Sequence, residues 1–259
     1  MKKMIIPIFK VLLLTITSIP AILLAGCFGY DEAAERSLII PVIDITSVRI
    51  NSLAGNLEVS GRSGLTEITA NGTAYARNEN DLDRLQFVTG TSGSEITIDM
   101  LTPPTNDPPT NYKFDAVIEI PDSFQVKIVD TSGDIKIHNT AGIHITDASG
   151  DVQIDKVTGV RITDASGDVL ISDVRGDVIV VGDGSGHIDI KNVSGNVEIF
   201  GDGSGDITVS GVSGNFHLGD DSSGDITARD IRGDFIVESD TSGSITYSNI
   251  DGRVEIPID

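Results

Sequence analysis

The 259-residue sequence contains one cysteine, no tryptophan, and only 18 basic residues against 39 acidic ones, so its formal net charge is −21. A single cysteine excludes a disulfide within the chain. The acidic excess argues against nucleic acid as a partner, because binding to phosphates requires clustered Lys and Arg side chains. We also find no basic run along the chain that would hold anionic lipid.

A repeat dominates the second half of the sequence. A Ser-Gly pair recurs there at a regular spacing, with an aspartate two positions before each serine and a second glycine nine positions after the first. The pairs are Ser132-Gly133, Ser149-Gly150, Ser166-Gly167, Ser185-Gly186, Ser204-Gly205, Ser223-Gly224 and Ser242-Gly243. The second glycines are Gly142, Gly159, Gly176, Gly195, Gly214, Gly233 and Gly252. Seven copies in register indicate a repeat architecture.

Apolar and polar residues alternate between these glycines, as in Ile207 and Val209, then Phe216 and Leu218. A period of two predicts strands with one buried face. Two short strands and two tight turns leave no room for a crossover helix, so each strand pairs most easily with its equivalent one repeat later. The sequence therefore predicts an all-β fold, a single-stranded parallel β-solenoid with two short strands per 17–19-residue coil. Such coils are stable only when stacked.

The corners between strands have a common pattern, with Asp or Asn usually first and Gly fourth. We expect the glycine of both corners to take a positive φ, which glycine adopts without strain. A further aliphatic residue stands two positions before the second glycine, and we expect it to fill the corner. These residues are Val157, Val174, Val193, Val212, Ile231 and Ile250.

The N-terminus predicts export. Lys2 and Lys3 precede an apolar stretch that ends in Leu24-Ala25-Gly26-Cys27, as in a secretory signal peptide. Leu-Ala-Gly-Cys resembles the lipobox of bacterial lipoproteins, which implies a signal peptide over 1–26, acylation of Cys27 and a lipid anchor (palmitate) in the membrane. The alternatives are an uncleaved transmembrane anchor and a soluble secreted protein. Phe28 replaces the aspartate that retains lipoproteins in the inner membrane, so an outer membrane is favoured if the cell is Gram-negative.

The mature chain divides into three parts by pattern. Residues 27–41 are expected to be a polar tether, 42–130 an irregular β region that caps the solenoid as imperfect coils, and 131–259 the seven regular coils. Two insertions interrupt the cap. Asn78 to Leu85 is expected to be a charged loop or a single helical turn, and Thr102 to Asn111 to be irregular, because four prolines disfavour helix and strand.

Scattered Gly-Asn and Ser-Gly corners, the transition AVIEIPDSFQVKIVDTSGDIKI at 116–137 and the repeated SGD coils resemble the bacterial putative adhesin family, a domain of unknown function. The likeness covers residues 42–259. It implies a β-solenoid on an exported or membrane-attached protein and carries no catalytic residues.

Stacked coils would align the seven Asp-x-Ser-Gly aspartates in a column, next to the acidic residues that follow the glycines. Each aspartate is expected to accept hydrogen bonds from amides of its own turn. Calcium between coils is the alternative. The string GDGSGD at 201–206 fails the register of the calcium-binding nonapeptide repeat, so we expect no cofactor, with calcium a minor possibility.

Catalytic signatures are scarce. The four histidines, His138, His144, His187 and His217, have no zinc-site spacing, and no GxSxG nucleophile elbow is present. The sequence predicts a protein that is not an enzyme, with a polysaccharide-acting solenoid enzyme as the remote alternative.

Two functional hypotheses remain. The first is a membrane-anchored, adhesin-like module of the cell envelope that binds a glycan or an envelope protein through its solenoid faces. The second is a structural or assembly scaffold of the envelope that docks through an open end. Pro257 and Asp259 near the C-terminus are expected to protect the terminal edge against docking.

Overall fold

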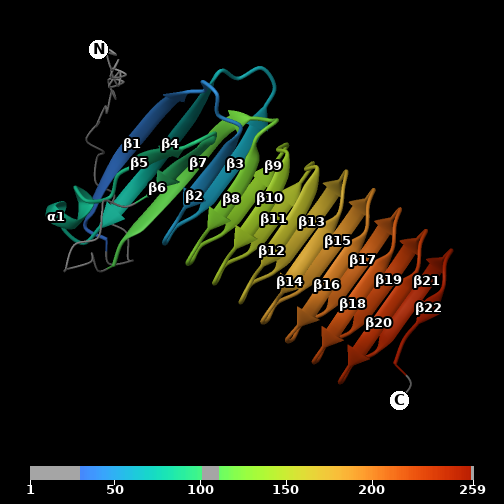
Figure 1. The fold of residues 1–259 in the computed structure, drawn as a ribbon. Coiled ribbons are helices and arrows are strands. Elements are labelled where there is room, and N and C mark those ends of the chain that lie inside the picture. The colour runs from blue at the N-terminus through green and yellow to red at the C-terminus, as the bar shows by residue number, and fades with distance from the viewer. Residues whose placement is uncertain (1–29, 101–110, 258–259) are drawn as a thin grey trace, which may run out of the picture.

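The computed structural model describes residues 30–100 and 111–257, which form an elongated stack of β-strands with one short helix (Figure 1). The strands make two sheets of eleven strands each. Their inward side chains form one hydrophobic cluster that runs along the stack. The prediction of an all-β parallel solenoid is confirmed.

The first sheet, sheet A, has the order β1-β4-β7-β3-β9-β11-β13-β15-β17-β19-β21. Its strands are β1 (Glu32–Pro41), β3 (Leu57–Arg62), β4 (Glu67–Ala76), β7 (Lys113–Pro121), β9 (Ile135–His138), β11 (Val152–Asp155), β13 (Val169–Val174), β15 (Ile188–Val193), β17 (Ile207–Val212), β19 (Ile226–Ile231) and β21 (Ile245–Ile250).

The second sheet, sheet B, has the order β22-β20-β18-β16-β14-β12-β10-β8-β2-β6-β5. Its strands are β2 (Ser47–Asn51), β5 (Val88–Ser92), β6 (Glu95–Asp99), β8 (Gln125–Val129), β10 (Gly142–Thr146), β12 (Gly159–Thr163), β14 (Val178–Gly182), β16 (Val197–Asp202), β18 (Phe216–Asp221), β20 (Phe235–Asp240) and β22 (Val254–Glu255). The helix α1 (Glu79–Leu82) lies at the N-terminal end of the stack (Figure 1).

Each strand of the regular coils pairs in parallel with its equivalent one coil later. In the shorter coils Val152 pairs with Val169, and in the longer coils Ile207 pairs with Ile226. The seven regular coils are β9 with β10, β11 with β12, β13 with β14, β15 with β16, β17 with β18, β19 with β20, and β21 with β22. Both repeat lengths therefore place identical positions over one another.

The Ser-Gly corners stack directly. The backbone N–H of Gly186 donates to the carbonyl oxygen of Ser204 in the next coil at 3.0 Å. Gly205 has a φ of +141°, and a Cβ added to it would lie 1.6 Å from the carbonyl oxygen of Gly186. The expectation of a positive-φ glycine is confirmed at this corner.

The second corner differs from the expectation. Its glycines, such as Gly214, are not in the positive-φ region, and that conformation falls three positions earlier, on residues such as Lys156, Asn192 and Gly211. Glycine is required at position 214 for another reason: an added Cβ would lie 2.4 Å from Asn196 Oδ1 and 2.6 Å from the oxygen of Gly195. Close approach of neighbouring coils, not backbone conformation, selects glycine here.

The corner aliphatics fill the interior as expected. Val157, Val174, Val193, Val212 and Ile231 are at most 1% exposed, and Ile250 of the last coil packs against the core while partly exposed.

The cap contains both stacking modes. β2 and β3 continue the parallel coils, because β2 pairs with β8 and β3 with β9. β4 is antiparallel to both β1 and β7, and β5 is antiparallel to β6. Imperfect coils therefore account for only part of the cap.

The expected tether over 27–41 is wrong from Glu32 onward. Glu32 to Pro41 is β1, a ten-residue strand paired with β4 along its whole length. Leu38 and Arg36 point inward and are buried. Arg36 donates from Nε to the carbonyl oxygen of Leu85 at 2.9 Å and from Nη2 to that of Leu82 at 3.0 Å, which holds α1 against the cap. Because these hydrogen bonds satisfy the buried guanidinium, the segment forms a strand although it places an arginine on its inward face.

The first insertion contains the expected helical turn, because α1 spans Glu79–Leu82 with Asn78 as its N-cap. Of the second insertion, all but Asn111 lies outside the described residues.

Candidate functional site

A column of exposed polar side chains follows the Ser-Gly corners of sheet A, one position after each glycine. The backbone N–H of Asp168 donates to Asp151 Oδ1 at 3.0 Å, and the N–H of His187 donates to Asp168 Oδ1 at 2.9 Å. The same bond recurs from coil to coil, with His187 Nδ1 accepting where the aspartate is replaced. We call this column the Asx ladder. Its members in the regular coils are Asp134, Asp151, Asp168, His187, Asp206, Asp225 and Ser244, and the same hydrogen bonds continue into the cap through Asn56 and Asp115.

These hydrogen bonds explain why exposed carboxylates tolerate one another at the coil spacing. An amide that donates to a carboxylate stabilises its charged form. Hydrogen bonds from the side chain and backbone of Ser244 lower the pKa of Asp225 below its usual range. Asp225 therefore keeps its negative charge at neutral pH.

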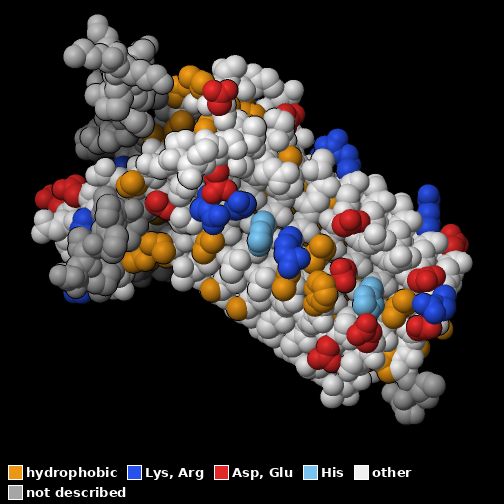
Figure 2. Space-filling view, in the orientation of Figure 1, with side chains coloured by type: hydrophobic (Ala, Val, Ile, Leu, Met, Phe, Trp, Pro, Cys, Tyr) orange, Lys and Arg blue, Asp and Glu red, His pale blue; other side chains and the backbone are white. Residues whose placement is uncertain are grey.

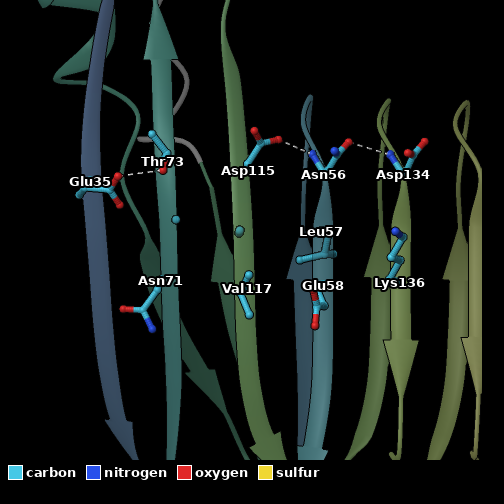
Figure 3. A pocket seen from close by; sticks show the side chains of 12 residues that line it. Glu35, Asn56, Leu57, Glu58, Asn71, Thr73, Asp115, Val117, Asp134 and Lys136 are labelled. Carbon is cyan, nitrogen blue, oxygen red and sulfur yellow. Dashed lines mark hydrogen bonds between the residues drawn. The ribbon is translucent and has the colours of Figure 1, made fainter. Parts of the chain in front are cut away.

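The outer face of sheet A is hollowed where the cap meets the first coils. A pocket of about 480 Å³ lies across β1, β4, β7, β3 and β9 (Figure 3). Asp115 and Asn56 of the ladder line one side, where Asp115 Oδ1 accepts from the N–H of Asn56 at 2.7 Å. On the far strands, Thr73 donates to Glu35 at 3.1 Å. The pocket thus combines apolar surface with polar side chains, several of which are held by hydrogen bonds.

A second hollow of about 430 Å³ continues along β9, β11, β13 and β15. Both hollows are lined by Asp134 and Lys136, so they form one groove, which we call the sheet A groove. Its floor carries two exposed apolar side chains, Val117 at 44% and Leu170 at 38% exposure. The groove thus offers carboxylate acceptors along one side, a lysine near its middle and small apolar patches between them.

A second column lies inside the solenoid, at the same corners. The Asp-x-Ser-Gly aspartates are nearly inaccessible to solvent, between 0% and 6% exposed in six of the seven copies. We call these six residues the buried aspartate column. They are Asp130, Asp147, Asp164, Asp183, Asp202 and Asp221.

Burial changes the acidity of this column. Loss of solvent, together with the charge of neighbouring aspartates, raises the pKa of Asp164 and of Asp202 to about 7. The same causes raise the pKa of Asp221 to about 6, and burial, the larger cause, raises that of Asp130 to about 6. Burial also raises the pKa of Asp147 and Asp183.

The expected hydrogen bonds within each turn are present in several copies. The N–H of Ser223 donates to Asp221 Oδ1 at 3.1 Å, and the N–H of Ala165 donates to Asp164 Oδ1 at 2.8 Å. Asp202 has no such bond. Among the described residues, no group of three or more His, Cys, Asp or Glu side chains could hold a metal ion.

The remaining predicted residues do not converge on one site. The histidines lie on separate strands and corners, and His144 and His217 point outward as expected. His217 contacts Glu238 at 2.8 Å. Cys27 lies outside the described residues. Within the described ranges, no helix is long and apolar enough to cross a membrane.

Sequence reading missed a basic row on the outer face of sheet B. Arg49, Lys127, His144 and Arg161 occupy the same position on the adjacent strands β2, β8, β10 and β12. Figure 2 shows basic side chains over these strands, beside apolar side chains further along the face. Glu95 bridges Lys127 at 2.7 Å and Arg49 at 3.2 Å. The row escapes detection because Arg49 and Lys127 are far apart in the sequence.

The model of the family described as Toastrack DUF4097 matches residues 88–256, which include most of the solenoid and part of the cap. The chain belongs to this family. A search of curated proteins found no match.

Several solved structures are also similar to this Toastrack chain. A putative adhesin from Bacteroides fragilis is 12% identical, with a TM-score of 0.42, over 89% of this chain and 99% of that one. A putative adhesin from Parabacteroides merdae is 14% identical, with a TM-score of 0.41, over 85% and 95%. A putative lipid binding protein from Parabacteroides distasonis is 15% identical, with a TM-score of 0.41, over 88% and 97%.

Proposed function

We propose that this Toastrack protein is a non-enzymatic binding module of the cell envelope, anchored by a lipid on Cys27, whose sheet A groove binds a neutral, hydroxyl-rich glycan. The observation that carries the proposal is the groove itself, a continuous hollow with a row of exposed carboxyl side chains along one side. Carboxylates in such a row accept hydrogen bonds from sugar hydroxyls.

The arrangement of the groove favours a glycan over other ligands. Val117 and Leu170 offer small apolar surfaces to the C–H face of a sugar ring, and polar groups surround both. The carboxylates of Asp134, Asp151 and Asp168 repel anionic polymers. The regular coils connect their strands by tight corners rather than long loops, so they build no deep cleft of the kind in which a glycosidase places its acid and base.

Binding of the full chain to a panel of neutral, amino and acidic oligosaccharides, measured by calorimetry, tests this function. Asp151→Asn preserves an acceptor for the Asp168 amide but removes one charge, and Lys136→Ala removes the central donor. Both variants should weaken binding by about 1.5–3 kcal/mol, the range for a hydrogen bond to a charged group. Thr227→Ala, on the same face outside the groove, is the control.

Two results would contradict the groove as the site. The first is neutral-glycan binding that Asp151→Asn and Lys136→Ala leave unchanged. The second is exclusive binding of acidic glycans that is lost in Arg161→Ala, because it would move the site to the basic row of sheet B.

The C-terminal end of sheet A favours the scaffold as a second candidate. β21 is the last strand of sheet A, and Ile245–Ile250 contains no charged residue. The expected protection does not cover this strand, because Pro257 follows β22 of sheet B, and Asp259 lies outside the described residues. An edge without charge or proline is open to pairing with another strand.

The scaffold can be tested separately from glycan binding. Thr246→Lys places a charge on the open edge, whereas Thr227→Lys places it at the equivalent position of the preceding coil. Cross-linking to one envelope protein that is lost only in Thr246→Lys would support the scaffold. Equal cross-linking in both variants would contradict it.

A further inference from the structure

The buried aspartate column brings carboxyl groups together at the spacing of neighbouring strands. Asp183 pairs with Asp202, Asp202 with Asp221, and Asp221 with Asp240 of the next coil. Strands in one sheet lie about 4.8 Å apart. Successive carboxyl groups are therefore within reach of one another at the same corner.

Many oxygens of this column have no hydrogen-bond partner among the described residues, although they are buried. They are both oxygens of Asp130 and Asp202, and Oδ2 of Asp147, Asp164, Asp183 and Asp221. A buried ionised oxygen without a partner is costly. Something other than the backbone must satisfy these atoms in the folded protein.

Among the described residues, no cation acts on the column. The charged groups that face the column, apart from its own members, are acidic: Asp134 faces Asp147, Asp168 faces Asp183, and Asp220 and Asp240 face Asp221. Two carboxylates this close repel by about 3–4 kcal/mol at an effective dielectric constant near 20. A fully ionised column would therefore oppose folding.

A metal ion fits these atoms poorly. Calcium requires six to eight oxygen ligands, and corner carbonyls already accept bonds from the adjacent coil, as Ser204 does from Gly186 and Asp183 does from Gly203. Each coil contributes only one aspartate to the column, and therefore only two carboxyl oxygens. A proton needs only two oxygens from adjacent groups.

We propose that the buried aspartate column is a proton-binding array, in which neighbouring carboxyl groups of the folded solenoid share protons that the unfolded chain releases. In each shared pair, the protonated carboxyl donates its O–H to an oxygen of the ionised neighbour, so that both orphaned oxygens gain a partner. No bond to carbon changes.

The hydrogen bonds within the column suggest how protons alternate. Asp147 and Asp183 each accept a backbone N–H from the serine two positions on, at 3.3 Å, which favours their ionised form. Asp202, which lies next to Asp183, accepts no such bond. Asp164 accepts the N–H of Ala165 through Oδ1 at 2.8 Å, so its proton resides on Oδ2, which has no partner among the described residues. Asp164 and Asp202, whose pKa is raised to about 7, are therefore the donors to Asp147 and Asp183.

The raised pKa values of these aspartates make the stability of the folded chain depend on pH. The pKa is raised in the folded state from an ordinary value of 3.8 to about 6 or 7, so the folded chain binds more protons than the unfolded chain between these values. Stability from the array is fully present below pH 4 and is lost as pH rises through 6 and 7. Its contribution therefore falls between pH 5 and pH 8.

Asp202→Asn tests the array, because the amide is neutral at every pH and can still donate to a neighbouring carboxylate. We expect the Tm of wild type to fall from pH 5 to pH 8, and that of Asp202→Asn to fall less. At pH 8 the variant should melt at least about 3–5 °C above wild type, the shift that one pKa unit in one group produces in a chain of this size. Asp206→Asn, in the exposed Asx ladder, should behave as wild type.

A spectroscopic readout keeps the test independent of folding yield. Wild type at pH 6 should show the infrared band of a protonated carboxyl group, which Asp164→Asn and Asp202→Asn each reduce and Asp206→Asn leaves intact. A Tm for wild type that is constant or rises from pH 5 to pH 8 would overturn the array. The array would also be overturned if calcium raised the Tm of wild type at pH 8 but not that of Asp202→Asn. The column would then hold a cation.

Discussion

Gly205 lies directly over Gly186, so closely that a Cβ on Gly205 would stand 1.6 Å from the carbonyl oxygen beneath it. The obstacle is a backbone atom, which cannot move without breaking the backbone hydrogen bonds to the coils on both sides. The Ser-Gly corners are therefore the positions at which the coil spacing is set.

Gly205→Ala should lower the free energy of unfolding by about 2–4 kcal/mol, because the φ of +141° strains an L-residue and the methyl group meets backbone. Urea unfolding followed by circular dichroism measures the loss. Gly182→Ala is the control, since an added Cβ there meets nothing within 4 Å. Equal stability of the two variants would refute the stacked corner.

The second corner has its own ladder of side-chain amides and carboxylates. Asn215 Oδ1 accepts from the N–H of Asp234 at 2.8 Å, and the N–H of Asn215 donates to Asn196 Oδ1 at 2.9 Å. Asn215→Ala should cost about 1 kcal/mol, the net value of one such bond, whereas Asn215→Asp should keep it. Chemical denaturation of these variants, with Ser213→Ala as control, checks this. A loss in Asn215→Asp as large as in Asn215→Ala would count against the ladder.

Removal of the Arg36 side chain should loosen one end of the molecule. Arg36→Met would remove the donor to the carbonyl oxygen of Leu85 and leave that of Leu82 with only the N–H of Leu85, at a cost of about 2 kcal/mol or more. Hydrogen exchange should accelerate over residues 79–87 and remain slow in the regular coils. Arg77→Met, at an exposed position, should leave exchange unchanged; faster exchange throughout the solenoid would mean that the cap is not an independent unit.

Cys27→Ser should abolish lipid attachment. Cells that express the full chain and are fed a palmitate analogue should label wild type and Phe28→Leu but not Cys27→Ser, and the unlabelled variant should leave the washed membrane fraction. Labelling of Cys27→Ser, or wild type that washes off membranes without label, would rule out the anchor.

The sequence was informative where the chain repeats itself. Identical positions recur in every coil, so the inward face of Ile207 and Val209 and the stacking of the Ser-Gly corners could be predicted by counting. The buried aspartates could be placed in a column, but not inside the protein, because an aspartate is ordinarily a surface residue.

The cap and the basic row could not be predicted in the same way. β1 pairs with β4 in antiparallel register without any repeat to mark it, and its inward Arg36 makes the segment look like a tether. Arg49 joins Lys127 only because β2 and β8 become neighbours after a long excursion of the chain. Both features depend on pairing between distant segments that share no periodic signal.

The early start of β1 limits how far the rod can stand from a membrane. Glu32 follows Cys27 closely in the sequence, and a fully extended chain of that length spans about 17 Å. If Cys27 is acylated, the start of β1 therefore lies within about 17 Å of the membrane anchor, and the cap and the adjoining groove are close to the lipid headgroups. With this anchor in place, a ligand of the sheet A groove would have to reach the membrane surface itself.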